Sequence, residues 1–201
     1  MRKSVVIFLF VLITGCSAGP KEVLIDGFER EIDKYTVDFG AAEGSKVIVS
    51  AALDKKTEGA QSLRIEYNLL PSGYMWVARG YGLDVAGAGD WDVLPENIEW
   101  KKYKGFSISM FGKATGGVIA LDIKDSGGEL WRFFLEDDFQ GWKSIVCPFL
   151  SFAPRSDWQP DDADINDKLD FPIKSFQFEP RVFGEQEYYF DEVKLLKDIN
   201  G

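Results

Sequence analysis

The sequence predicts an all-β protein, an antiparallel β-sandwich of jelly-roll type. Short runs in which apolar and polar residues alternate recur along the chain, as expected for strands with one buried face. Clusters of Gly, Pro, Asp and Ser separate these runs, and no helical period is sustained over three turns. The 201 residues are enough for one sandwich domain with a sizeable core.

The expected strands follow one another at short intervals. A polar tether precedes the folded domain, which is expected to span residues 23–201. Alternation is cleanest in residues 62–69, where Leu63, Ile65, Tyr67 and Leu69 share one face. The full set of expected strands is 23–29, 46–50, 62–69, 74–81, 106–111, 118–124, 129–135, 142–147, 173–178 and 188–195.

Residues 118–135 have the pattern of a β-hairpin. Ile119, Leu121 and Ile123 alternate with more polar residues, and a second run of strand composition follows at 129–135. The connecting Asp-Ser-Gly-Gly segment, residues 125–128, consists of turn residues. Two longer loops are expected at 86–104 and, with strongly acidic composition, at 157–170; loops of this length in a compact domain are often functional.

The N-terminus has the composition of a secretory signal. Arg2 and Lys3 precede an apolar run, residues 5–13, that is too short to span a bilayer as a helix. The small residues before Cys16 resemble the lipobox of bacterial lipoproteins. We therefore expect residues 1–15 to be a lipoprotein signal peptide, Cys16 to carry lipid, and residues 16–22 to form a short tether. The alternative is a plain secretory signal with an incidental cysteine.

Lipid on Cys16 would hold the protein on a membrane of the bacterial cell envelope, facing the periplasm or the exterior. The other cysteine, Cys147, lies in an expected strand and is predicted to be a small core residue without a disulfide partner. The formal charge of −10 disfavours nucleic acid as a partner, because such a surface repels phosphates.

Composition restricts the possible chemistry. The chain has no histidine, which excludes histidine-based general base catalysis, serine triads with histidine, and histidine metal ligands. A glycosidase using two carboxylates is still possible. Chance pairs are expected among 33 acidic residues, so carboxylates alone are weak evidence for catalysis. The available candidates are Glu66, Asp122, Glu129, Glu136 and Asp138.

Aromatic residues give a stronger signal than the carboxylates. Sugars present C–H patches that stack on aromatic rings, while nearby carboxylate, amide and guanidinium groups bind the hydroxyls. Trp158 is flanked by Arg155, Asp157 and Gln159 in a polar loop, which is the composition of such a platform. The alternative is that each tryptophan packs in the sandwich core.

The sequence also contains acidic residues that could supply oxygen ligands to a cation. Glu29 follows the first expected strand and Asp191 lies in the last, with a loop at 54–62 between them in the chain. Calcium binds six to eight oxygens, and turn carbonyls near Thr57 and Gln61 could complete the set. The alternative is that Glu29 and Asp191 are ordinary surface acids.

Taken in order, several segments resemble the family 11 carbohydrate-binding modules and the related carbohydrate-binding-like domain of complex I intermediate-associated proteins. The resemblance spans residues 23–197 and implies a sandwich of the galactose-binding-like type. The matching segments are Asp-Gly-Phe-Glu at 26–29, Tyr-Lys-Gly-Phe-Ser-Ile at 103–108, Asp-Phe-Gln-Gly-Trp-Lys at 138–143, Pro-Phe at 148–149, Arg-Ser-Asp-Trp-Gln-Pro at 155–160, Ile-Lys-Ser-Phe at 173–176 and Tyr-Phe-Asp-Glu-Val at 189–193.

The resemblance implies a concave sheet that binds β-glucan chains and structural calcium remote from that cleft. Arg155, Asp157 and Trp158 match an Arg-x-Asp-aromatic segment that contacts ligand in the family, with tryptophan replacing the more usual tyrosine. Glu29 and Asp191 match positions that commonly supply the cation. Further ligand contacts are expected from residues that alternate out of the core on neighbouring strands, namely Asp122, Lys124, Trp131 and Gln177.

These observations favour a non-catalytic, membrane-anchored lipoprotein that binds a polysaccharide, with a β-glucan as the expected ligand. Family 11 modules usually accompany a catalytic glucanase domain, and this chain contains none that its sequence identifies. The second hypothesis is a protein-interaction or assembly domain whose aromatic patch contacts another protein. The third is a glycan-active hydrolase.

Overall fold

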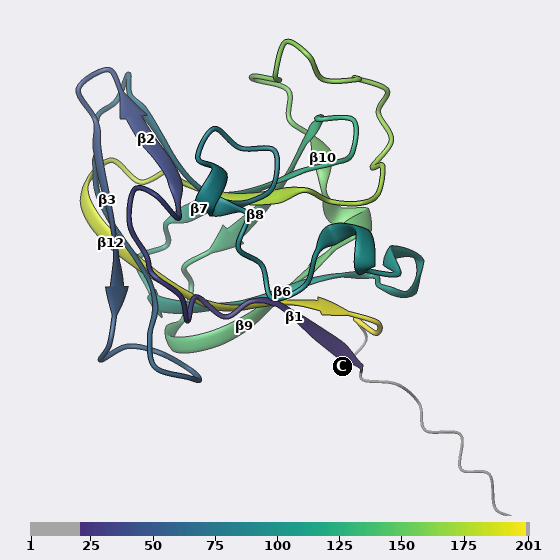
Figure 1. The fold of residues 1–201 in the computed structure, drawn as a ribbon. Coiled ribbons are helices and arrows are strands. Elements are labelled where there is room, and N and C mark those ends of the chain that lie inside the picture. Colours follow the sequence, from purple (N-terminus) through teal and green to yellow (C-terminus); the bar gives the residue numbers. More distant parts are fainter. Residues whose placement is uncertain (1–20, 200–201) are drawn as a thin grey trace, which may run out of the picture.

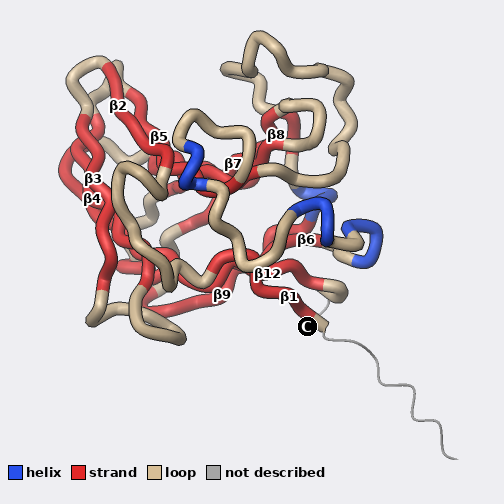
Figure 2. Tube along the Cα trace, in the orientation of Figure 1, coloured by secondary structure: helices blue, strands red, loops and turns tan. Residues whose placement is uncertain are grey.

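Two antiparallel sheets packed face to face form the protein, which confirms the predicted β-sandwich (Figures 1 and 2). The computed structural model describes residues 21–199. Sheet A has the strand order β3-β4-β12-β6-β9, with β1 also paired to β12. Its strands are β1 (Glu22–Asp26), β3 (Lys46–Ala52), β4 (Ser62–Leu69), β6 (Gly105–Lys113), β9 (Gln140–Pro148) and β12 (Gly184–Leu196).

Sheet B has the strand order β10-β8-β7-β11-β5-β2. Its strands are β2 (Asp38–Ala42), β5 (Tyr74–Gly80), β7 (Val118–Lys124), β8 (Leu130–Glu136), β10 (Ala153–Pro154) and β11 (Ser175–Pro180). The helical structure within residues 21–199 consists of short 3₁₀ segments, drawn in blue in Figure 2. They are η1 (Ala86–Ala88), η2 (Pro95–Asn97), η3 (Trp100–Lys102) and η4 (Phe149–Ser151).

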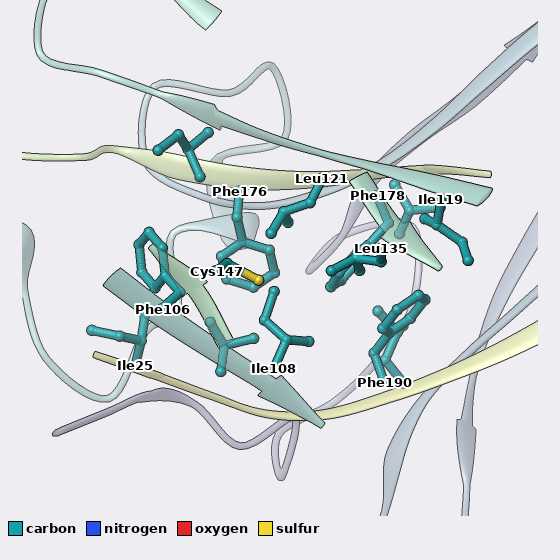
Figure 3. Packing of buried hydrophobic residues seen from close by; sticks show 14 of the residues in the cluster. Ile25, Phe106, Ile108, Ile119, Leu121, Leu135, Cys147, Phe176, Phe178 and Phe190 are labelled. Carbon is teal, nitrogen blue, oxygen red and sulfur yellow. The ribbon is translucent and has the colours of Figure 1, made fainter. Parts of the chain in front are cut away.

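The core lies between the two sheets and is rich in aromatic rings (Figure 3). Phe178 of sheet B stacks on Phe190 of sheet A, with ring centroids 3.8 Å apart and planes 10° from parallel. Ile108 and Cys147 are also buried in this layer. Burying one such Phe side chain contributes about 1.5 to 3 kcal/mol, so these contacts hold the sheets together.

The predicted hairpin is confirmed. Strands β7 and β8 pair from Val118 opposite Glu136 to Lys124 opposite Leu130. In the turn, the Asp125 carboxylate accepts a hydrogen bond from the Glu129 backbone N–H at 3.0 Å. Gly128 has φ of 89°, in the region that favours glycine, and so allows the chain to reverse.

Two strands were not expected from the sequence, β2 and the two-residue β10. Residues 86–104, expected as a loop, contain η1, η2 and η3. The two tryptophans of this segment are buried: Trp91 stacks on Phe176, and the Trp100 indole N–H donates to the Pro95 carbonyl oxygen at 2.9 Å. They attach the segment to the core.

Cys147 is fully buried, as predicted, and forms no disulfide within residues 21–199; burial raises the pKa of its thiol. Strand β1 begins at Glu22, one residue before the expected start of the domain. The predicted signal peptide and the predicted lipidation site, Cys16, lie outside the described residues. Between residues 21 and 199, no helix has the length and apolar character needed to cross a bilayer.

Candidate functional site

The outer face of sheet B carries a row of five cross-strand neighbours, four of which are polar. Cross-strand neighbours in this row are Arg132 on β8, Asp122 on β7, Gln177 on β11, Ala78 on β5 and Asp38 on β2. Since alternate residues of a strand face the same side, these side chains point away from the core. Four of them, all except Arg132, line a cleft of about 890 Å³.

A buried carboxylate occupies the floor of the cleft. Asp122 has no exposed surface, and both of its oxygens accept hydrogen bonds from arginine. Arg132 donates from Nε to Oδ1 at 2.7 Å and from Nη2 to Oδ2 at 2.9 Å. Arg155 donates from Nη1 to Oδ2 at 3.0 Å. The bidentate geometry fixes the guanidinium plane of Arg132 beneath the cleft.

Glu179, on β11, extends this network to Arg181. Its Oε2 accepts a hydrogen bond from Arg132 Nη2 at 2.7 Å, and its Oε1 accepts one from Arg181 Nη1 at 2.6 Å. Burial raises the pKa of Glu179, and the charges of Arg155 and Arg132 partly oppose that rise. Burial acts to lower the pKa of Arg132, but the hydrogen bond and charge of Asp122 outweigh it and raise the pKa. The floor is therefore a fixed array of paired charges.

Trp158 forms one aromatic platform of the cleft. Its side chain is 56% exposed, and the Arg155 guanidinium carbon lies 5.5 Å from its ring centroid. Arg155 also donates from Nε to Asp157 Oδ1 at 2.9 Å. Burial acts to raise the pKa of Asp157, but the hydrogen bond and charge of Arg155 outweigh it and lower the pKa. Asp157 thus remains an ionised acceptor beside the ring.

Tyr74 and Trp76 on β5 form a second aromatic platform in the same cleft. Their rings stack with centroids 6.1 Å apart, and Tyr74 is 53% exposed. The Trp76 indole N–H donates to Asp38 Oδ1 at 3.1 Å. On β2, a Cβ at Gly40 would lie 2.4 Å from the Trp76 ring, so only glycine there lets the ring lie against the strand.

Most of the predicted ligand residues gather in this cleft, where their role in binding stays a prediction. Gln159 does not line it; its side-chain amide instead bonds the backbone of Leu130 and the Arg155 carbonyl oxygen, which holds the loop against β8. The predicted ligand residues that line the cleft are Asp122, Lys124, Arg155, Asp157, Trp158 and Gln177.

The expected outward orientation of Trp131 is wrong. Its side chain belongs to the hydrophobic core and is 7% exposed. The register places Trp131 opposite Ile123, whose side chain faces the core, and Arg132 opposite Asp122. Sequence reasoning chose the wrong face of β8 and therefore missed Arg132. It also missed Asp38, Tyr74, Trp76 and Glu179.

The two predicted cation ligands hold one loop. Glu29 Oε2 accepts a hydrogen bond from the Ala60 backbone N–H at 2.8 Å. Asp191, fully buried, accepts at Oδ2 from the backbone N–H and the hydroxyl of Thr57, at 2.8 and 2.7 Å. Within residues 21–199, no three acidic, cysteine or histidine side chains converge as a group able to hold a metal. Asp191 also accepts from the Glu58 N–H at Oδ2, at 3.5 Å, and from the Glu192 N–H at Oδ1, at 2.9 Å, so a cation would have to share its oxygens with these donors.

The cleft contains one of the five carboxylates weighed for catalysis, Asp122. Both Asp122 oxygens are occupied by arginine, as described above. Glu66 lies on sheet A, where it pairs with Arg64 at 3.0 Å, and Glu129 is fully buried. The described geometry therefore offers aromatic faces and fixed hydrogen-bonding groups, the features that retain a sugar chain.

The sequence matches the family described as carbohydrate binding domain (family 11) over residues 13–198. The chain belongs to this family. One relative of known activity by name is Endoglucanase H of Acetivibrio thermocellus, to which the chain is 27% identical over 180 residues. That match covers 87% of this chain and 18% of Endoglucanase H, so the chain spans less than a fifth of that protein.

Solved family 11 modules have the same fold. One is the module from Clostridium thermocellum in complex with a β-1,3-1,4-mixed-linked tetrasaccharide, with a TM-score of 0.66 and 24% identity. The match covers 87% of this chain and 95% of that module. Another is the module of the cellulosomal cellulase Lic26A-Cel5E of Clostridium thermocellum, with a TM-score of 0.65, 23% identity and coverage of 87% and 94%.

Proposed function

We propose that the protein is a non-catalytic binder of β-glucan, and that the cleft on sheet B holds the sugar chain. The observation that carries this proposal is the presence of two exposed aromatic platforms, Trp158 and the Tyr74–Trp76 pair, in one cleft with a polar floor. Membership in family 11 supports it independently. The related module that was solved with a mixed-linked tetrasaccharide suggests the ligand class.

Binding would combine stacking with hydrogen bonds to hydroxyls. The sugar C–H faces would stack on Trp158 and Trp76, which removes apolar surface from water. Asp157 and Gln177 would then bond the hydroxyls, since both line the cleft and neither is fully buried. The charges of Arg132 and Asp122 neutralise each other, so the floor suits an uncharged chain better than an acidic one.

A glycan array with soluble β-glucans, neutral mannans and acidic polysaccharides tests this function. Saturable binding of β-glucans by folded protein is the expected result. A blank array together with a stable protein partner in a pull-down would instead favour the protein-interaction hypothesis. Release of reducing ends from a bound glucan would favour the hydrolase.

We also propose that the protein is a lipoprotein of the bacterial cell envelope, anchored through Cys16. The supporting evidence is the order of basic residues, apolar run and small residues that precede Cys16 in the sequence. Mass spectrometry of the protein from its own cells should find a chain that begins at Cys16 and carries acyl groups. A mature N-terminus elsewhere would contradict this assignment.

Calcium bound near Glu29 and Asp191 is a further proposal. Asp191 is fully buried, and no lysine or arginine between residues 21 and 199 forms a salt bridge with it, so a cation would compensate its charge. At a hundredfold excess over Kd, calcium should stabilise the fold by about 2.7 kcal/mol. The measurement is thermal unfolding in calcium and in chelator.

The matched variants for this prediction are Glu29→Gln and, as a control, Glu31→Gln. Glu31 is exposed and its side chain forms no salt bridge within the described residues. Glu29→Gln should lose the calcium-dependent stabilisation, whereas Glu31→Gln should retain it. Equal melting temperatures of the unaltered protein in calcium and in chelator would contradict the proposal that calcium binds here.

A further inference from the structure

Lysines from three segments of the chain gather at one end of the sandwich. The Lys197 backbone N–H donates to the Lys21 carbonyl oxygen at 2.9 Å, and the Lys104 N–H donates to the Leu196 carbonyl oxygen at 2.7 Å. Lys101 and Lys102 lie in η3, and Lys104 is the second residue after it. Figure 1 shows β1 and the last residues of β12 meeting at the lower right. We call this region, with Lys21, Lys101, Lys102, Lys104 and Lys197, the lysine end.

The positive charge of the lysine end is partly compensated, since Glu22, Glu99 and Asp198 lie close to these lysines in the chain. Lys21, Lys101, Lys102 and Lys104 are exposed. Of these, Lys102 pairs with Glu99, whereas no salt bridge is found for Lys101 or Lys104 among residues 21–199. The neighbouring Glu22 lies 3.5 Å from Lys194. A cluster of lysines is notable in a protein whose formal charge is −10.

An exposed leucine lies beside these lysines. The Phe149 backbone N–H donates to the Lys104 carbonyl oxygen at 2.9 Å, which places η4 against the lysine end. The next residue, Leu150, is 98% exposed. Phe149 also contacts Phe171, with ring centroids 5.2 Å apart, and Phe171 is 39% exposed. Exposed apolar side chains near lysines are typical of surfaces that sit in the interface of a membrane.

The sequence outside the described residues indicates which surface this end would contact. Twenty residues precede Lys21, and they include the apolar run 5–13. If the apolar run or a lipid on Cys16 is inserted in a membrane, the start of the folded domain is held close to that membrane. The lysine end is then held close to it as well. An anionic bilayer attracts nearby lysines and accepts an exposed leucine.

We propose that the lysine end is a membrane-contacting surface that binds anionic lipid headgroups, with Leu150 entering the interface. The overall negative charge does not oppose this contact strongly, because charges more than about 8 Å from the bilayer are screened at physiological salt. None of the five lysines lines the cleft on sheet B. The bound orientation therefore leaves the cleft free for a polysaccharide.

Vesicle co-sedimentation of the full 201-residue chain tests the proposal. Vesicles of phosphatidylcholine are compared with vesicles that also contain phosphatidylglycerol, because the apolar N-terminal run contributes to binding on both. The partition coefficient of the variant K101Q/K102Q/K104Q on the anionic vesicles should be roughly 10- to 100-fold lower than that of the unaltered protein. The control K34Q/K46Q/K168Q removes the same charge from three exposed lysines elsewhere and should partition like the unaltered protein.

A second pair of variants tests the leucine. Leu150→Asp should weaken binding to anionic vesicles, whereas Leu53→Asp, at a leucine that is 67% exposed in another loop, should not. Melting temperatures confirm that each variant is folded. Equal losses in the two lysine variants, or equal binding of the unaltered chain to neutral and anionic vesicles, would overturn the proposal. Capture of an acidic protein by the lysine end without vesicle binding would also overturn it.

Discussion

Asp122→Ala should destabilise the protein by about 3 to 5 kcal/mol, because it removes the fully buried one of the carboxylates that Arg132 and Arg155 share and leaves them Glu179 and the exposed Asp157 in common. Asp122 is fully buried, and the Arg132 side chain is 9% exposed, so water cannot readily replace the lost partner. Chemical denaturation monitored by tryptophan fluorescence measures the change. Asp122→Asn, which keeps the shape and removes the charge, should lie between the alanine variant and the unaltered protein.

The control for this prediction is Asp162→Ala. Asp162 also lines the cleft, but it is exposed and forms no salt bridge among the described residues. Its removal should change the free energy of unfolding by less than about 0.5 kcal/mol. If Asp122→Ala is as stable as Asp162→Ala, the arginine network does not maintain the floor of the cleft.

Trp158→Ala and Trp76→Ala should each weaken glucan binding by roughly 1 to 3 kcal/mol, since each removes one stacking platform. The two rings belong to different elements, a loop and β5, and they contact different neighbours, so the losses in the double variant should be nearly additive. Isothermal titration with a β-glucan oligosaccharide measures the affinities.

Trp142→Ala is the matched control for stacking. Trp142 is partly buried on β9 of sheet A, where its ring meets Phe111 edge to face at 5.6 Å. It does not line the cleft, so its replacement should leave glucan affinity unchanged. A loss of affinity in Trp142→Ala with none in Trp158→Ala would place the sugar on the other sheet.

Local sequence pattern was sufficient to predict the sandwich and its central hairpin. Alternation identifies β4, whose residues are by turns buried and partly exposed, and β7, whose large apolar residues alternate with small or polar ones although both of its faces are buried. Strand β2, Asp-Phe-Gly-Ala-Ala, was not predicted from the sequence because its small residues have little strand propensity. It pairs with β5 through contacts between residues such as Gly40 and Trp76, which lie far apart in the sequence. No local pattern reports such a contact.

The candidate site was predicted in part. The loop with Arg155, Asp157 and Trp158 could be singled out because charged and aromatic residues adjoin one another in the chain. The platform of Tyr74 and Trp76 had a weaker signal, their alternation with Met75 and Val77. Trp131 was misplaced because alternation alone does not say which face of a strand is buried when both faces carry large side chains.

A crystal structure of the protein soaked with a mixed-linked β-glucan tetrasaccharide is the most direct test of the proposed cleft. The expected result is a sugar chain on sheet B, with one ring stacked on Trp158 and another near Trp76, and with hydroxyls bonded to Asp157 or Gln177. A chain bound on the outer face of sheet A, with the sheet B cleft empty, would contradict the assignment of the site.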